Sequence, residues 1–147
     1  MKRFRFKLQA VLEQRKSKED HLLAELGEIR REEAREAARL IALRQELESA
    51  RRAIVDGLAG NAPADELERR DDYAKAKRDD VCVQELTLEA IGERVEAKRA
   101  EVVEAMKERK VLEALRDRQE GAYLAECARA EQNEMDAMAS LQYAREM

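Results

Sequence analysis

The sequence predicts an all-α protein, a long antiparallel two-helix coiled-coil hairpin whose second helix overhangs the first. Three observations lead to this prediction. Alanine, glutamate, arginine, leucine and lysine make up well over half of the 147 residues, a composition typical of long helices. Aromatic residues are only 3% of the chain, which leaves apolar material for a narrow seam rather than a wide core. A single cluster of helix-breaking residues interrupts the pattern.

Disorder is the competing interpretation of a chain in which 42% of the residues are charged. The charges nearly balance, with 29 bases against 33 acids, so the formal net charge is only -4. Disordered chains also favour proline, serine and glycine, whereas this one has one proline, five glycines and many strong helix formers. We therefore expect folded helices, with any disorder at the ends.

The first helix is expected to run from about residue 3 to 57. Positions spaced alternately by four and three residues mark a seam that would face a partner helix. Most of them are leucine or isoleucine, and polar residues interrupt the seam at Arg15 and Glu19 and again at Glu33 and Glu36. The seam consists of Leu8, Leu12, Arg15, Glu19, Leu22, Leu26, Ile29, Glu33, Glu36, Leu40, Leu43, Leu47, Ala50 and Ile54.

A turn is expected at about 58–64, where Gly57, Gly60, Asn61 and Pro63 lie close together. Glycine suits the end of a helix, and proline suits the beginning of the next. Because short turns join antiparallel helices, position i of the first helix should lie near position ~122 − i of the second.

The second helix is expected to run from about residue 65 to 144, completing a single hairpin domain over residues 1–147. Its seam has polar steps at Gln84, Lys98 and Arg109 and slips towards Leu115 near its end. The apolar positions of this seam are Val81, Leu88, Ile91, Val95, Val102, Ala105 and Leu112. The start of the first helix should lie opposite about residue 118 of the second. Roughly the last 25 residues should therefore lack a partner within the chain.

Residue patterns for catalysis, cofactor binding or metal binding are absent from the sequence. The one histidine, His21, and the aspartate pairs at 71–72 and 79–80 lie on predicted helix faces, where solvation is the ordinary interpretation. Cys82 and Cys127 would lie about 65 Å apart on one helix, too far for a disulfide. A two-helix hairpin also offers no enclosed pocket. We therefore expect neither an enzyme nor a small-molecule binder.

Charge is distributed unevenly between the two ends of the chain. Residues 1–18 contain seven bases and one acid, whereas residues 119–147 contain two bases and six acids. Such blocks are often interaction surfaces. The overall pI of about 5.3 weighs against nucleic acid as the partner. No apolar run approaches the roughly 20 residues of a membrane span, and the N-terminus lacks the apolar region of a secretory signal. Cys82 and Cys127 are expected to be reduced thiols of a cytosolic protein.

Three stretches carry a resemblance to a known family. They are the opening Phe4–Arg15, with its Phe-x-Phe-x-Leu pattern, the segment Lys110–Arg118, and the closing Gln132–Asp136. They resemble the flagellar export protein family called FliJ, although Ala137 stands where that family usually has another acidic residue. The resemblance implies a cytosolic, non-enzymatic component of the bacterial flagellar type III export apparatus, associated peripherally with the inner membrane.

The resemblance also implies partners. Family members are thought to act like the stalk of rotary ATPases, inserting their paired terminal ends into the hexameric export ATPase. They also contact the export-gate membrane protein and substrate chaperones. This role in flagellum biogenesis and motility predicts a coupling and escort factor, monomeric when free. The alternatives are the equivalent stalk protein of a virulence injectisome, and a structural coiled-coil scaffold.

Two places are candidates for partner binding. The first is the open end of the hairpin, where the basic segment 2–7 would meet acidic loops of the ATPase and the apolar contacts would come from Phe4, Phe6, Leu8, Leu112, Leu115 and Tyr123. The alternative is that these six residues merely close the coiled coil. The second place, for the export gate, is the middle of the hairpin around Leu40–Ile54 and Tyr73–Leu88. There Tyr73 is either an exposed contact or packs on Ala50 across the hairpin.

Overall fold

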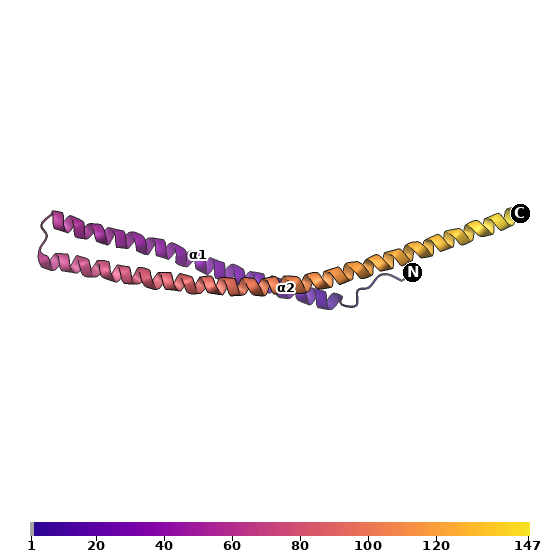
Figure 1. The fold of residues 1–147 in the computed structure, drawn as a ribbon, viewed down its shortest axis with the longest axis horizontal. Coiled ribbons are helices and arrows are strands. Elements are labelled where there is room, and N and C mark those ends of the chain that lie inside the picture. Colours follow the sequence, from indigo (N-terminus) through magenta and orange to yellow (C-terminus); the bar gives the residue numbers. More distant parts are fainter. Residues whose placement is uncertain (1) are drawn as a thin grey trace. The chain divides into compact units, whose positions relative to one another are not determined.

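The protein consists of two long helices joined by one short turn (Figure 1). The computed structural model describes residues 2–147. Helix α1 covers Gln9–Ala59 and helix α2 covers Ala64–Glu146, so 92% of residues 2–147 are helical, and none of them forms a strand. The predicted all-α hairpin is confirmed.

The chain divides into two compact units, and each contains a segment of both helices. Unit 1 consists of Met1–His21 and Val103–Met147, and unit 2 consists of Leu22–Val102. Unit 2 therefore holds the turn, and unit 1 brings together the two terminal parts of the chain. That residues 1–147 form a single domain stays a prediction.

Helix α1 begins at Gln9, which corrects the expected start at about residue 3. Residues 2–6 have no regular secondary structure, and Lys7 and Leu8 form a turn. The cause is local, because residues 2–7 carry four bases and positive charge is unfavourable at the positive end of a helix dipole. No serine, threonine, aspartate or asparagine stands there to cap an earlier start.

The turn occupies residues 60–63, inside the predicted range. Asn61 adopts the left-handed backbone conformation, with φ of 52°, which asparagine tolerates better than most residues. Arg70 ties the turn together, because its guanidinium donates to the Ala53 carbonyl oxygen at 2.5 Å and to Glu66 at 2.7 Å. Gly57 makes room for this guanidinium, since a Cβ there would lie 2.9 Å from an Arg70 nitrogen.

The core is the narrow seam that the heptad pattern predicts. In unit 2, Leu26 packs with Ile91 and Val95, close to the expected partner position. A second cluster in unit 2 joins Leu40 and Leu47 to Val81. All the predicted seam positions of α1 except Leu8 are buried or half-buried. In unit 1 the most deeply buried side chain is Leu12, at 0% exposure.

The polar steps of the α2 seam each find a partner on α1. Gln84, only 5% exposed, donates to the Glu36 carbonyl and carboxylate oxygens at 2.9 and 2.5 Å. Lys98 pairs with Glu25 at 2.8 Å. These contacts satisfy groups whose burial would otherwise be costly.

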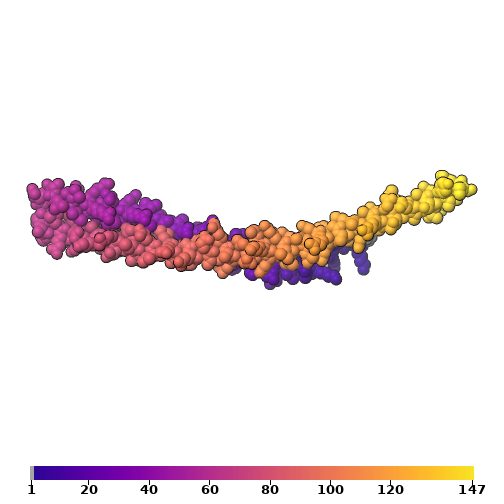
Figure 2. Space-filling view, in the orientation of Figure 1, coloured from indigo at the N-terminus to yellow at the C-terminus, as the bar shows by residue number. Residues whose placement is uncertain are grey.

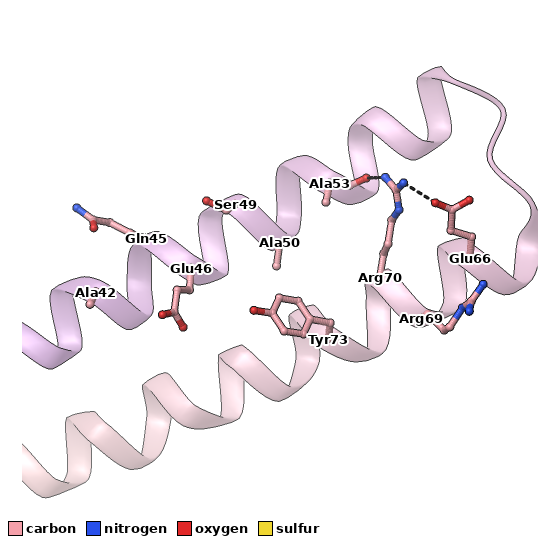
Figure 3. A pocket seen from close by; sticks show the side chains of 10 residues that line it. All are labelled: Ala42, Gln45, Glu46, Ser49, Ala50, Ala53, Glu66, Arg69, Arg70 and Tyr73. Atoms are coloured by element: carbon pink, nitrogen blue, oxygen red, sulfur yellow. Dashed lines mark hydrogen bonds and ion pairs between the residues drawn. The ribbon is translucent and has the colours of Figure 1, made fainter.

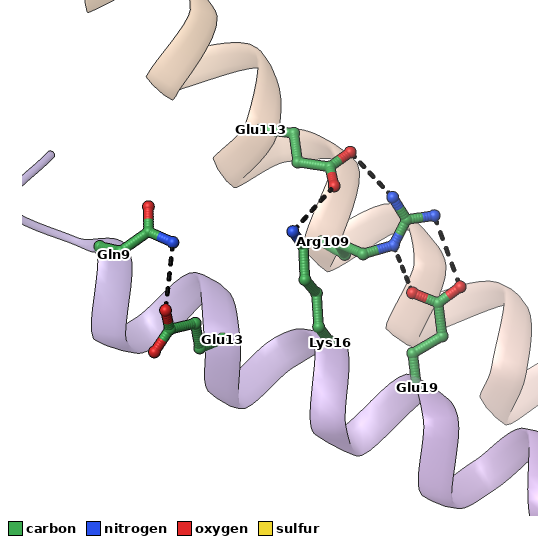
Figure 4. Close-up of polar contacts among 6 residues, drawn as sticks. All are labelled: Gln9, Glu13, Lys16, Glu19, Arg109 and Glu113. Atoms are coloured by element: carbon green, nitrogen blue, oxygen red, sulfur yellow. Dashed lines mark hydrogen bonds and ion pairs between the residues drawn. The ribbon is translucent and has the colours of Figure 1, made fainter.

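The third polar step lies in unit 1 (Figure 4). Arg109 of α2 pairs with Glu19 of α1 and with Glu113 one turn along its own helix. Lys16 approaches Glu113 at 4.0 Å from the other helix, so one carboxylate serves two bases. The polar interruption of the seam is therefore an ionic network that links the two helices.

Candidate functional site

Residues 2–8 of unit 1 form an N-terminal strap, a non-helical segment that precedes α1 and lies against α2. Its Phe4 ring lies 5.6 Å from the ring of Tyr123, centroid to centroid, with the planes tilted by 38°. The Tyr123 hydroxyl donates a hydrogen bond of 2.5 Å to the Lys2 carbonyl oxygen. Phe6 is 8% exposed. The strap is thus held by the Phe4–Tyr123 contact, by the hydrogen bond to Lys2 and by the burial of Phe6.

The Tyr123 hydroxyl keeps its proton and so remains a hydrogen-bond donor. A side-chain hydrogen bond with the Cys127 thiol, and secondarily partial burial, raise the pKa of the Tyr123 hydroxyl above its ordinary value of 10.0. The hydroxyl therefore stays protonated through the neutral range, and it remains a donor to the strap.

The six residues predicted to form the partner-binding end all belong to unit 1, but they differ in exposure. Phe6 is buried, and Leu8 is 39% exposed. The others, Phe4, Leu112, Leu115 and Tyr123, are half-buried. Direct contact is seen between Phe4 and Tyr123, and Phe4 and Phe6 line one small pocket with Arg116. Part of the set thus closes the coiled coil while part stays accessible.

Beyond the strap, α2 continues as an unpaired helix within unit 1 (Figures 1 and 2). Every side chain from residue 131 to 147 is exposed. The exposed apolar ones are Met135, Met138, Leu141 and Tyr143, at 62–66%. Met135, Met138 and Leu141 follow one another at intervals of three residues and so lie along one side of the helix, whereas Tyr143, two residues after Leu141, faces a different side. The predicted unpartnered segment is therefore present, with an apolar stripe suited to packing against another protein.

Unit 2 contains a second candidate surface, close to the turn (Figure 3). A pocket of about 630 Å³ opens between the helices, and Tyr73 reaches into it from α2. Tyr73 is 54% exposed and its ring lies 5.4 Å from the Lys77 ammonium, whereas Ala50 is 4% exposed. The lining residues are Ala42, Gln45, Glu46, Ser49, Ala50, Ala53, Glu66, Arg69, Arg70 and Tyr73.

This pocket was not predicted, although a signal for it exists in the sequence. The α1 side of the pocket is built from small residues, among them Ala42, Ser49, Ala50 and Ala53. Small side chains at these spacings opposite a lone tyrosine leave space between two helices. Tyr73 is therefore exposed and lines the same pocket as Ala50, and its role as a partner contact stays a prediction.

Metal-ligand clusters do not occur among the residues that the structure describes. Both cysteines are free thiols, Cys82 exposed and Cys127 half-buried. His21 is an exposed helix residue, as expected. Within residues 2–147, neither helix contains a stretch long and apolar enough to cross a membrane.

Comparison with known proteins identifies the family. A model of the family described as the flagellar FliJ protein matches residues 4–147, nearly the whole chain. No curated protein and no solved structure matches significantly. The matched range includes the strap, both helices and the unpaired end of α2. The chain therefore belongs to the flagellar FliJ family, whose members are components of flagellar type III protein export.

Proposed function

We propose that this protein is the stalk of the flagellar export ATPase, coupling the hexameric ring to the export gate at the cytoplasmic face of the inner membrane and escorting substrate chaperones. Family membership supports a role in export. The observation that carries the finer proposal is the arrangement of unit 1. Its strap, its α2 aromatic and an unpaired apolar helix are adjacent, so that one end of the hairpin offers an adhesive surface.

The ATPase-binding surface, in this proposal, combines the strap with the α2 residues behind it. Phe4 and Leu8 supply accessible apolar area, and Tyr123 holds the strap in place. Aromatic residues often dominate the binding energy of protein interfaces. Leu112, Leu115 and Phe6 lie deeper and support this surface rather than forming its outer face.

Replacing Phe4 and Phe6 together by alanine tests the proposal. The double variant should bind the ATPase at least about tenfold more weakly, the loss typical of an interface anchor. Its helicity by circular dichroism should stay nearly intact, because the strap is not helical. A matched control replaces Leu23 and Ile41, exposed apolar residues of unit 2, by alanine. Equal affinity of the double variant and the control for the ATPase would contradict the assignment of the strap to the ATPase-binding surface.

The pocket at Tyr73 supports a second contact, with the cytoplasmic domain of the export gate or with a chaperone. Tyrosine presents an apolar ring and a polar tip, a combination enriched at interfaces. We expect Tyr73→Ala to weaken gate or chaperone binding while leaving ATPase binding unchanged. Leu23→Ala, at an exposed apolar residue of unit 2 that does not line the pocket, is the control. Loss of ATPase binding by Tyr73→Ala would contradict two separate surfaces.

The rival functions make different predictions. An injectisome stalk would bind the ATPase of a virulence system, and gene neighbourhood separates the two; the family match favours the flagellar system. A structural scaffold would form a stable oligomer, whereas the proposed stalk is a monomer when free. Sedimentation velocity of the purified chain distinguishes them, and pull-down from the source cell should recover a hexameric ATPase.

A further inference from the structure

A small basic pocket lies beneath the N-terminal strap in unit 1. Its volume is about 460 Å³, and it is formed where the strap meets the start of α1 and the α2 helix. Three of its side chains are guanidinium groups and two are phenyl rings. The lining residues are Arg3, Phe4, Arg5, Phe6, Gln9 and Arg116.

The three arginines differ from their neighbours in lacking an acidic partner. In the same unit Arg15 pairs with Glu108 at 2.9 Å, and Arg109 pairs with Glu19 and Glu113. Within residues 2–147, by contrast, no ion pair involves Arg3, Arg5 or Arg116. Arginine does not lose its proton in proteins, so the pocket holds three uncompensated positive charges.

The start of α1 adds to this positive potential. Gln9, the first residue of the helix, lines the pocket, and the first turn of α1 contains no acidic residue. A helix N-terminus carries about half a positive charge. The backbone N–H groups of Gln9 and Leu12 already donate to the carbonyl oxygens of Phe6 and Leu8, so this helix end contributes positive potential more than open donors. The arginines and the helix end therefore favour a negatively charged ligand at the same place.

We propose that this pocket binds an acidic segment of a protein partner, receiving aspartate or glutamate carboxylates between the arginines. A guanidinium can hold a carboxylate through two parallel hydrogen bonds, and half-buried Arg116 has less water to displace. The Phe4 and Phe6 rings provide an apolar wall for the residues that flank an acidic side chain. The pocket volume suits a few side chains rather than a large ligand.

An acidic peptide fits better than a membrane or a nucleic acid. The same unit contains residues 119–147, where six acids outnumber two bases. These acids are spread along the helix, so an extended polyanionic surface would meet more of them than a short acidic segment held in the pocket, and would be repelled more strongly. An inorganic phosphate would use the arginines and leave the phenyl rings without a role.

The partner's identity rests on the proposed function, so the first test uses the ATPase and the full chain. Arg3→Gln/Arg5→Gln/Arg116→Gln should lower affinity about tenfold or more and flatten its dependence on salt. The matched control, Arg31→Gln/Arg52→Gln/Arg99→Gln, removes equal charge from exposed sites in unit 2 and should lower affinity far less. Arg3→Lys/Arg5→Lys/Arg116→Lys should bind at an intermediate level, because lysine keeps charge without the paired hydrogen bonds.

Two outcomes of that test overturn the pocket while leaving the proposed function intact. One is equal binding by the glutamine variant and its control. The other is full binding by the lysine variant, which would indicate general attraction between charges. In both cases the wild-type chain still binds the ATPase.

The second test needs no ATPase. A short peptide of alternating glutamate and leucine should bind the full chain, and the glutamine variant should not bind it. Peptide binding together with no ATPase binding would refute the proposed partner and keep the pocket. Arginine-dependent binding of inorganic phosphate or of phosphatidylglycerol vesicles, with no peptide binding, would overturn the proposal in favour of a phosphate ligand. Absence of binding by every probe would also overturn it.

Discussion

Gln84 shows how a single polar side chain sets the alignment of two helices. It is buried at a seam position and donates to both the backbone and the carboxylate of Glu36, 48 residues away in sequence. A shift of one helix along the other would leave the amide buried without acceptors, which costs more than the hydrogen bonds gain. A buried polar residue of this kind specifies register more than it adds stability.

Replacing Gln84 by alanine should therefore destabilise the fold by about 1–3 kcal/mol, because the buried contacts are lost and a gap remains. Urea unfolding followed by circular dichroism measures this change. The control is Gln45→Ala at an exposed position of α1, which should change the free energy of unfolding by less than about 0.5 kcal/mol. Similar losses in both variants would show that Gln84 makes no special contribution.

Lysine ammonium groups between the helices make stability depend on alkaline pH. Hydrogen bonds to Glu46 and to Glu25 raise the pKa values of Lys77 and Lys98 above 10.5. A raised lysine pKa adds stability that is fully present below about pH 10.5 and is lost as pH rises through the folded-state value. The melting temperature should therefore hold up to about pH 10 and fall as the pH rises above about 10.5. In Lys77→Arg/Lys98→Arg the fall should be smaller, and an identical fall would contradict this cause.

At the scale of elements, the strap and the unpaired end of α2 are opposite solutions for a chain terminus. The strap is not helical, but it is held in place by Phe4, Phe6 and the hydrogen bond from Tyr123 to Lys2. The α2 end keeps its helix but has no neighbour from residue 131 onwards within the described chain. A segment held by few contacts opens easily, so both elements are suited to rearrange when a partner arrives.

Tyr123→Phe should loosen the strap without removing the aromatic contact. It deletes the hydroxyl that donates to Lys2 but keeps a ring beside Phe4. We expect faster tryptic cleavage at Arg3 and Arg5 and unchanged helicity. Tyr143→Phe, at an exposed tyrosine, is the control and should leave the cleavage rate unchanged. Equal rates for wild type and Tyr123→Phe would mean that the hydroxyl does not hold the strap.

Features of the fold that depend on repeated side-chain patterns could be predicted from the sequence. Contacts that depend on the position of a backbone carbonyl or N–H group could not. The heptad seam, the turn and the polar steps at Gln84, Lys98 and Arg109 follow from spacing and side-chain chemistry. The contact from Tyr123 to Lys2 does not, because its acceptor is a carbonyl oxygen that every residue carries. The basic pocket was missed for a related reason. It forms because the strap is not helical and its path places Arg3 and Arg5 beside Arg116 of α2, which the heptad pattern does not reveal.

At the scale of the whole molecule, protection of the backbone should vary along the chain. Unit 2 holds the two apolar clusters, whereas residues 131–147 pack against nothing else in the described chain. An isolated helix of this length is marginal in water, because most helical stability in proteins comes from packing.

Amide hydrogen exchange of the free protein should therefore be slow around Leu26, Leu40 and Val81 and fast from residue 131 onwards. Adding the binding partner should slow exchange in the strap and in the α2 end. Exchange of a variant truncated after residue 130 is the control, since its unit 2 amides should be unchanged. Uniform protection along the free chain would contradict this picture.

The narrow seam has a consequence for calorimetry. The buried apolar side chains are few for a chain of 147 residues, and several of them are alanine. Unfolding should therefore expose little new apolar area, and the heat-capacity increment should fall below the usual ~12–15 cal/mol/K per residue. A small increment flattens the curve of free energy against temperature. The protein should thus keep nearly constant, modest stability over a wide range of temperatures, and its thermal transition should be broad.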